Sequence, residues 1–229
     1  MSSRMSGTAS RILARLIAMA TLSVPAPVLA TEAGPAVLLN TATALLSEIL
    51  ALPDGGIPAD LWARANCIVI VPGFSTADRY GKGVVCCRKQ KGTGWASPGM
   101  VHVESGGGSF SSGGWETDLV MLVMTERGVN RVLEDKFTVG VDGSAAAGPI
   151  GRTARAQTAA QLHADVLSWS RTGGLLASFT LEGVTLRPDL DDNTKLYGKT
   201  LTNAEIVTQA VPVPKIASRL IGLLKSACR

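Results

Sequence analysis

The chain has 229 residues, with 22 lysines and arginines against 18 aspartates and glutamates, which gives a formal net charge of +4. A hydrophobic fraction of 46% with so small a net charge excludes an intrinsically disordered chain, and glycines without a period exclude a collagen-like one. The length suits one domain, or two small ones, with ample apolar mass for a core. A pI near 9.0 suggests nucleic-acid or membrane-surface binding as a hypothesis, and its support depends on where the charges lie.

Residues 1–30 have the pattern of a secretory signal peptide. Three arginines precede the apolar stretch 16–24, and Val28 and Ala30 stand at the −3 and −1 positions of a cleavage site. The stretch is too short for a membrane span, which needs about 20 apolar residues, and an amphipathic first helix is the alternative. Without these arginines, 19 basic residues face 18 acidic ones, so nucleic-acid binding loses its main support. We therefore expect an exported protein, periplasmic or secreted, with a peripheral membrane location as an option.

The first half of the remaining chain reads as two helices followed by strands. Apolar residues at helical spacing predict a helix over 36–52, and a second, short helix is expected to end near Arg64. Strand patterns then dominate, at 67–71, 82–88, 95–103, 118–124 and 137–141, with a helix over 126–135. The run 118–124 is apolar throughout, which is typical of a strand buried on both faces.

The second half continues the mixed pattern. The small residues of 142–151 would let another backbone or layer approach closely. Extended structure is expected over 162–170 and 175–186, and short helices over 191–198 and 202–208. Residues 31–229 are thus predicted to form a single α+β domain, with a largely antiparallel sheet, flanking helices and a C-terminal amphipathic helix.

Four cysteines remain after removal of the signal peptide. An oxidising compartment permits disulfides. Cys86 and Cys87 are adjacent in a predicted strand and point to opposite faces, so Cys67 can pair with Cys86 or with Cys87. Buried free thiols are the equally weighted alternative, and Cys228 has no predicted partner.

The C-terminal segment 213–229 is predicted to be a basic amphipathic helix. Residues 206–229 contain no acidic residue and carry +4. Such a helix can lie on an anionic membrane, or dock on the core with a solvated basic face, which is the commoner case. In the membrane reading, its basic residues meet headgroups and its leucines enter the interface: Lys215, Arg219, Lys225 and Arg229, with Leu220, Leu223 and Leu224.

Little in the chain indicates catalysis or metal binding. His102 and His163 are the only histidines, and no nucleophile motif accompanies them. Asp189, Asp191 and Asn193 open like a calcium loop, but the later positions of that loop do not match. An N-cap at Asp191 or Asp192 for the following helix explains these residues more simply, so calcium is a minor option.

Blocks along the chain resemble the SYLF domain family. The matching blocks are Tyr80-Gly-Lys-Gly-Val-Val, Gly94-Trp-Ala-Ser-Pro98, Thr117-Asp-Leu-Val-Met-Leu-Val-Met124, Lys136-Phe-Thr-Val-Gly140, Ala145-Ala-Ala-Gly-Pro-Ile-Gly-Arg152, Leu167-Ser-Trp-Ser-Arg171, Gly173-Gly-Leu-Leu-Ala177, Leu181-Glu-Gly-Val184 and Leu196-Tyr-Gly198. They occur in family order within roughly residues 36–212. The resemblance implies an α+β fold and a lipid-binding, non-enzymatic domain; eukaryotic relatives bind phosphoinositides, and some bind actin.

The resemblance also suggests a second basic patch and two departures. The patch is formed by basic residues within or beside the family-like blocks: Lys82, Arg88, Lys136 and Arg152. Segments 73–79 and 109–114 are shorter than in the family, which puts any lipid contact there in doubt. The helix over 36–52 lacks the basic residues of the eukaryotic first helix, so a specific phosphoinositide role does not carry over.

Three functions follow in order of expectation. The first is a non-enzymatic envelope module that binds anionic phospholipid, without a cofactor. The second is a protein-interaction or structural module of the envelope with no lipid ligand. The third and weakest is a hydrolase that uses His102 or His163.

Overall fold

The computed structural model describes residues 34–52, 56–90, 93–106, 114–141, 144–151 and 159–228. The expected signal peptide, Arg152, Arg229 and residues 109–113 of the second shortened segment lie outside this part of the chain. Within the described residues, no helix is both long enough and apolar enough to cross a membrane.

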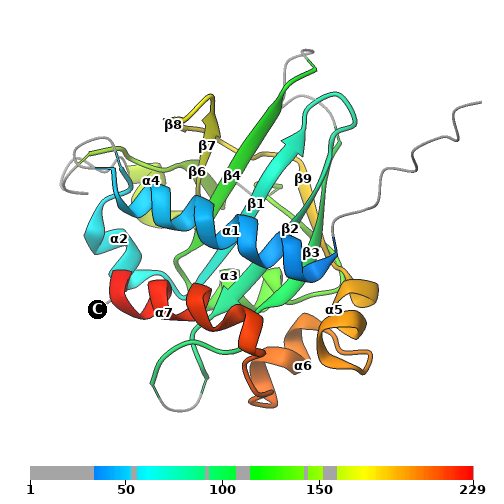
Figure 1. Cartoon of the computed structure of the whole chain (residues 1–229). Helices are drawn as coiled ribbons and strands as arrows, with labels where there is room; N and C mark the ends of the chain where they lie inside the picture. Colours follow the sequence, from blue (N-terminus) through cyan, green and yellow to red (C-terminus); the bar gives the residue numbers. More distant parts are fainter. Residues whose placement is uncertain are drawn as a thin grey trace, which may run out of the picture. The chain divides into compact units, whose positions relative to one another are not determined.

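The described residues contain nine strands in one curled sheet (Figure 1). In chain order the strands are β1 (Cys67–Ser75), β2 (Tyr80–Cys87), β3 (Gly99–Ser105), β4 (Glu116–Val123), β5 (Phe137–Thr138), β6 (Ala145–Ala147), β7 (Val166–Thr172), β8 (Leu175–Ser178) and β9 (Val184–Pro188). Their order is β5-β9-β3-β2-β1-β4-β7-β6, and β8 also pairs with β7. Every pairing is antiparallel except β6 with β7. The predicted α+β class with a largely antiparallel sheet is confirmed.

The central strands are buried on both faces, because helices cover one face and the curl of the sheet encloses the other. Along β1, Val69 and Val71 belong to the apolar cluster inside the curl of the sheet, which we call the enclosed cluster. Ile68 and Ile70 point to the other face and pack beneath the helices. β4 alternates in the same way, with Met121 on the enclosed side. The doubly buried strand predicted over 118–124 is therefore confirmed.

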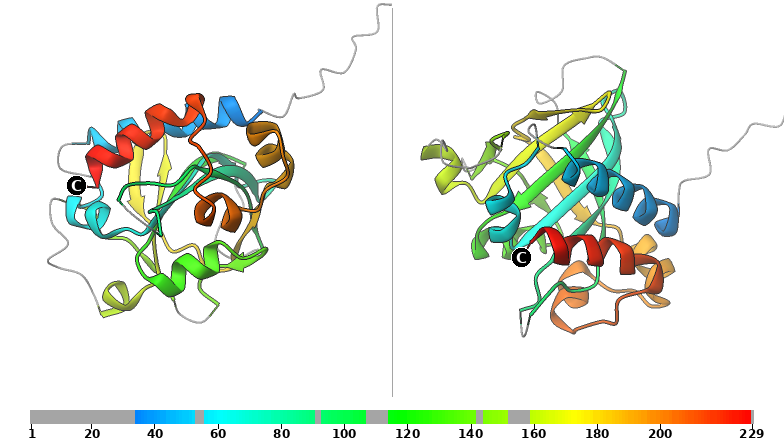
Figure 2. Two further views of the ribbon diagram at one scale, coloured as in Figure 1. Left: turned by 90° about the horizontal axis from the view of Figure 1, so that it is seen from below. Right: turned by 60° about the vertical axis from the view of Figure 1, so that its left-hand side comes forward.

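Helices α1 (Pro35–Leu50) and α7 (Ser218–Ala227) lie side by side on the outer face of the sheet (Figures 1 and 2). The short helix α2 (Ala59–Arg64) touches α7, and η2 (Lys215–Ala217) is a 3-10 turn that leads into α7. Helix α3 (Glu126–Val132) lies on the opposite side of the curled sheet, as Figure 2 shows. The C-terminal helix was predicted over 213–229 and is shorter, because Pro214 and the 3-10 turn precede it.

Helices α5 (Leu190–Tyr197) and α6 (Asn203–Thr208) are fixed to β3 by buried amide groups. The backbone N–H of Met100 donates to Asn193 Oδ1 at 2.8 Å, and Asn203 Nδ2 donates to the Met100 carbonyl at 3.1 Å. Asn193 Nδ2 links the two helices by donating to Asn203 Oδ1 at 2.9 Å. The short helices predicted over 191–198 and 202–208 are confirmed.

Two expected extended stretches are interrupted. The stretch predicted over 162–170 begins inside helix α4 (Ala159–His163), and its strand starts only at Val166. The stretch predicted over 175–186 is broken between β8 and β9 by a turn that contains Gly183 with φ of 76°. The alternation of apolar residues in the sequence continues through this turn, because Leu181 lies in the turn and is buried in the enclosed cluster.

The small residues after β5 lie against β7, as expected. A Cβ atom on Gly148 would stand 1.9 Å from Cζ2 of Trp169, so only glycine fits there. Trp169 Nε1 in turn donates to the Pro149 carbonyl at 3.1 Å. The predicted close approach is confirmed at this point.

A disulfide joins Cys67 to Cys87, across β1 and β2. The two residues are direct partners in the strand register, and both face the enclosed cluster. Cys86 faces the helices instead and is a free thiol, whose pKa burial raises to about 12. Of the two pairings predicted for Cys67, the structure selects the one with Cys87.

Candidate interaction surface

The apolar side of α7 is part of the core. Leu220 and Leu224 have 0% exposure and pack in the cluster between the helices and the sheet, with Ile221 beside them. Leu223 is half-buried against the same cluster. The expectation that these leucines enter a membrane interface is therefore corrected for Leu220 and Leu224, which lipid cannot reach while α7 is docked.

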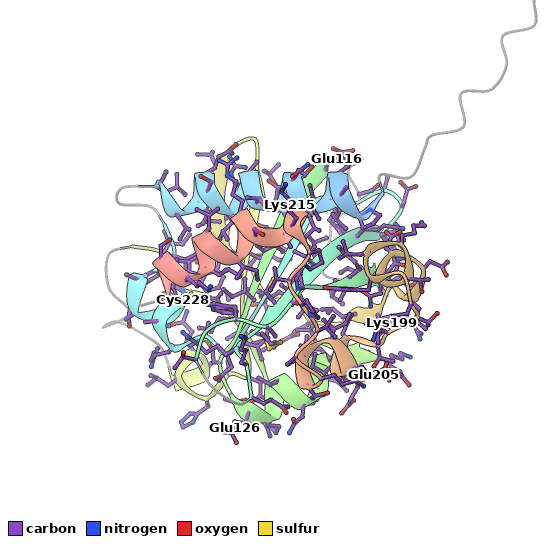
Figure 3. All side chains as sticks on the ribbon, turned by 60° about the horizontal axis from the view of Figure 1, so that its bottom comes forward. Glu116, Glu126, Lys199, Glu205, Lys215 and Cys228 are labelled. Carbon is purple, nitrogen blue, oxygen red and sulfur yellow. A yellow bond between two sulfur atoms is a disulfide. The ribbon has the colours of Figure 1, made fainter. Side chains whose placement is uncertain are left out.

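The outer side of α7 is basic and exposed. Lys215, Arg219 and Lys225 are all exposed, and none forms an ion pair or side-chain hydrogen bond with another described residue. Figure 3 labels Lys215 and Cys228 at the two ends of this C-terminal segment. Val213 and Ile216, at 37% and 39% exposure, add apolar surface at its start. We call these five residues the α7 surface: Val213, Lys215, Ile216, Arg219 and Lys225.

Arg88 fastens the end of α7 to the domain. Its Nε donates to the Ala65 carbonyl at 2.9 Å, and its Nη2 donates to the carbonyls of Ala63 at 2.7 Å and Cys228 at 3.3 Å. The guanidinium also lies 5.1 Å from the ring centre of Trp95. Arg88, which follows β2, therefore links the ends of α2 and α7 through three hydrogen bonds to carbonyl groups.

A groove of about 460 Å³ adjoins the α7 surface. The buried residues Ala96, Ser97 and Val207 line it, together with Val213 of the α7 surface. Exposed Lys89 and Gln90 line it as well, so an apolar floor lies beside a positive charge. Lys225 extends toward the same β2–β3 connection, since its Cε lies 3.9 Å from the position that a Cβ on Gly94 would take. Ser97 Oγ donates to the Val211 carbonyl at 2.5 Å and closes one wall.

Two residues of the second predicted basic patch, Lys82 and Arg88, form contacts inside the fold. Lys82 lies on β2 with its Nζ 3.1 Å from both Asp189 and Asp192. Arg88 is occupied by carbonyl groups as described, Lys136 is exposed next to β5, and Arg152 lies outside the described residues. Lys82 and Arg88 thus form contacts within the fold rather than a common surface.

The carboxylates near Lys82 organise the start of α5. Asp189 is the N-cap, accepting from the Asp192 backbone N–H at 2.9 Å, which corrects the expected cap at Asp191 or Asp192. Its Oδ2 also lies 3.2 Å from His102 Nε2. Burial opposes ionisation of Asp189, but the bonds from His102, the Asp192 backbone and Lys82 outweigh it and hold the pKa of Asp189 below its usual range. The same pairing raises the pKa of Lys82 despite the opposing effect of burial.

The calcium option finds no support in this geometry. Asp191 is exposed, whereas Asn193 is buried and its side-chain amide is hydrogen-bonded to Met100 and Asn203. No group of three or more His, Cys, Asp and Glu side chains in the described ranges is placed to hold a metal ion.

The two histidines have different environments. His102 is held at both ring nitrogens, with Tyr80 Oη 2.5 Å from Nδ1 and Asp189 on the other side. His163 is exposed at the end of α4. Both ring nitrogens of His102 are thus engaged in contacts that connect β2, β3 and the start of α5.

The groove is the part of the surface that the sequence did not indicate. Its walls come from the β2–β3 connection and from the segment after α6, more than 100 positions apart in the chain. No periodicity or motif joins these two segments. The Val211-Pro-Val-Pro214 stretch, which follows the last turn of α6, is the single local sign of an extended wall.

Comparison with known proteins identifies relatives over most of the chain. A family model described as "Ysc84: Las17-binding protein actin regulator" matches residues 104–227. Protein YSC84 of Saccharomyces cerevisiae is 31% identical over 180 residues, which cover 76% of this chain and 38% of that protein. The human SH3 domain-containing YSC84-like protein 1 is 31% identical over 179 residues, covering 76% and 52%, and the Xenopus laevis protein of that name is 32% identical over 180 residues, covering 76% and 53%.

The chain spans about two fifths to one half of the length of these relatives. The matched residues include the strands β4 to β9, the 3-10 turn η2 with Lys215, and the helix α7 with Arg219 and Lys225. The extent of these matches confirms the SYLF resemblance, and the chain belongs to the Ysc84 (SYLF) family.

Proposed function

We propose that this chain is a non-enzymatic binding module that docks a protein partner on the α7 surface and the adjoining groove. The observation that carries the proposal is the set of exposed cations, Lys215, Arg219 and Lys225, which have no ion-pair or hydrogen-bond partner among the described residues and adjoin a partly apolar groove. Protein interfaces combine an apolar centre with a polar rim in this way. The partner that fits is an acidic segment with apolar side chains.

The family adds support from a different direction. Its description names a Las17-binding protein and actin regulator, and a yeast relative bears the name LAS seventeen-binding protein 3. These names support a protein ligand for the domain type. This chain matches only part of those proteins, so the proposed partner is characterised by its chemistry, an acidic segment with apolar side chains.

A second candidate is an anionic phospholipid surface, and the same three cations favour it. Each basic side chain near such a surface contributes about 1 kcal/mol, so three would supply about 3 kcal/mol, or roughly 150-fold. Burial of Leu220 and Leu224 removes the apolar insertion that would strengthen this contact. Export to a periplasmic or extracellular location would bring the chain to an envelope, and the Cys67–Cys87 disulfide is typical of oxidising compartments.

Photo-crosslinking tests the protein reading. A photo-reactive residue at Ile216 should capture one defined protein in the producing cell, whereas the same residue at exposed Glu116, the first residue of β4, which starts at the end of the sheet away from α7 in Figure 1, should not. Charge reversal by Arg219→Glu with Lys225→Glu should abolish the adduct. The matched control, Lys136→Glu with Lys199→Glu, changes the same number of exposed charges and should leave it intact. Equal adducts from both positions, or an adduct insensitive to the α7 reversal, would contradict the proposal.

Vesicle sedimentation tests the lipid reading with the same variants. Binding to phosphatidylglycerol vesicles and not to phosphatidylcholine vesicles, lost on the α7 reversal and kept in the control, would favour lipid over protein. Binding that ignores the α7 reversal would remove this surface from either function.

A further inference from the structure

Strand β8 is an outer strand of the sheet, paired with β7 on one side. Both β6 and β8 pair with the same strand, β7, which has β4 on its other side. β8 has no second strand partner among the described residues, and Figure 1 shows it at the margin of the sheet. Leu175 is 78% exposed, Ala177 and Ser178 are exposed, and Leu176 is half-buried.

The register shows which backbone groups of β8 are not hydrogen-bonded to β7. Gly173 and Gly174, with φ of 56° and 84°, form the two-residue loop between β7 and β8. The residues that flank such a loop are a hydrogen-bonded pair, and the pairs then alternate along the hairpin. Leu176 and Ser178 fall at the non-bonded positions, so their N–H and C=O groups point away from β7. The bond from the Phe179 N–H to the Ser168 carbonyl, at 3.3 Å, continues the same alternation.

The β8 edge carries no charged side chain, no proline and no bulge. Edge strands are normally protected by a charged side chain, a proline, a bulge or a covering element. Residues 172–178 read Thr-Gly-Gly-Leu-Leu-Ala-Ser, with neither charge nor proline, and the pairing with β7 runs without a bulge. A second strand can therefore approach β8 without electrostatic repulsion.

We propose that β8 is a docking edge for a second copy of this chain, with the two β8 strands antiparallel about a two-fold axis at Ala177. In this register, Leu176 of each copy faces Ser178 of the other. Both residues offer an outward N–H and C=O, so the two facing pairs form four backbone hydrogen bonds. The two Ala177 side chains meet at the axis, where their small size allows close approach.

Self-complementarity is what favours a second copy over a foreign strand. In a two-fold interface each surface meets its own copy, so any charge near the axis would repel itself. The four β8 side chains are uncharged, and the free backbone groups match one another in number and spacing. The large exposed surface of Leu175 lies beside the axis and gains apolar cover in the pair.

Charge placed at the axis provides the test. Ala177→Lys and Ala177→Asp each set like charges face to face in a pair of identical copies, and each is expected to weaken the dimer at least about tenfold. An equimolar mixture of the two variants pairs Lys with Asp and should restore the dimer. Ala177→Ser is the matched neutral control and should behave as the wild type, and circular dichroism of each variant checks folding, since residue 177 is exposed.

Sedimentation velocity of the purified protein over a concentration series is the measurement. The expected result is a wild-type dimer that grows with concentration, monomeric charged variants, and a dimer in their mixture. A wild type that stays monomeric up to about 1 mM, the weak end of the affinity range, overturns the proposal. A dimer that survives both charged variants, or one that the mixture does not restore, overturns the β8 axis.

Discussion

Truncation of Leu224 separates a core-docked α7 from one that presents its leucines to lipid. Leu224 has 0% exposure and lies in the cluster beneath α1 and α7. Removing a fully buried leucine costs about 2–5 kcal/mol through lost transfer energy and the cavity left behind. For a chain of this size, each kcal/mol lowers the Tm by about 2–4 °C, so a loss of 3 kcal/mol lowers it by about 6–12 °C.

Thermal and urea unfolding of the purified protein, followed by circular dichroism, measure this effect. Leu223→Ala is the matched control on the same helix, because Leu223 is only half-buried and should lose less. Arg219→Ala, at an exposed position, should stay within about 0.5 kcal/mol of the wild type. If Leu224→Ala also stayed within that range, α7 would not be docked as described, and the membrane reading of its leucines would return.

Three further tests, with four variants in all, concern contacts that hold the domain together. A carboxyl whose pKa is lowered in the folded state contributes stability that is complete above its ordinary pKa and is lost as the pH falls. Asp189→Asn removes this carboxyl, so the variant should lose less Tm than the wild type as the pH falls below about 4. Equal losses of Tm in the variant and the wild type would contradict this. Cys67→Ser should cost about 3 kcal/mol in urea unfolding by releasing a loop with a sequence separation of 20, and unchanged stability would argue against the pairing. Gly148→Ala forces a methyl group into Trp169 and should cost about 1–3 kcal/mol of stability. Gly222→Ala is the control, because no atom lies within 4 Å of the added Cβ, and it should stabilise α7 by about 0.5–1 kcal/mol. Similar Tm values for the two variants would refute the close packing of Gly148 on Trp169.

The fold was largely predictable because most elements carry their own periodicity. The helix over 36–52 and the apolar run 118–124 are local patterns, and each appears where the pattern placed it. The extended reading of 175–186 failed at its centre, because Leu181 continues the apolar alternation while the backbone turns. Alternation reports which side chains are buried, and it does not report whether the strand that carries them is continuous.

The candidate surface was less predictable, because it depends on contacts between distant segments. The amphipathicity of α7 was read correctly, but its apolar side fits a membrane and a protein core equally well. In the structure, α7 packs on the protein core. It contacts α1, and Arg88 bonds its end to α2 through the carbonyls of Ala63, Ala65 and Cys228. Lys82 shows the same limit, since nothing local places it within 3.1 Å of Asp189.

The two proposed surfaces have a joint consequence that can be measured. Three cations on one copy supply only about 3 kcal/mol at an anionic surface, which is weak binding. Pairing through β8 would present two α7 surfaces to the same partner, and linked sites bind more tightly than either alone. Ala177→Lys should then weaken binding to phosphatidylglycerol vesicles or to an acidic protein partner, although it adds a positive charge. Mixing it with Ala177→Asp should restore that binding. Unchanged or stronger binding by Ala177→Lys would show that each α7 surface acts alone.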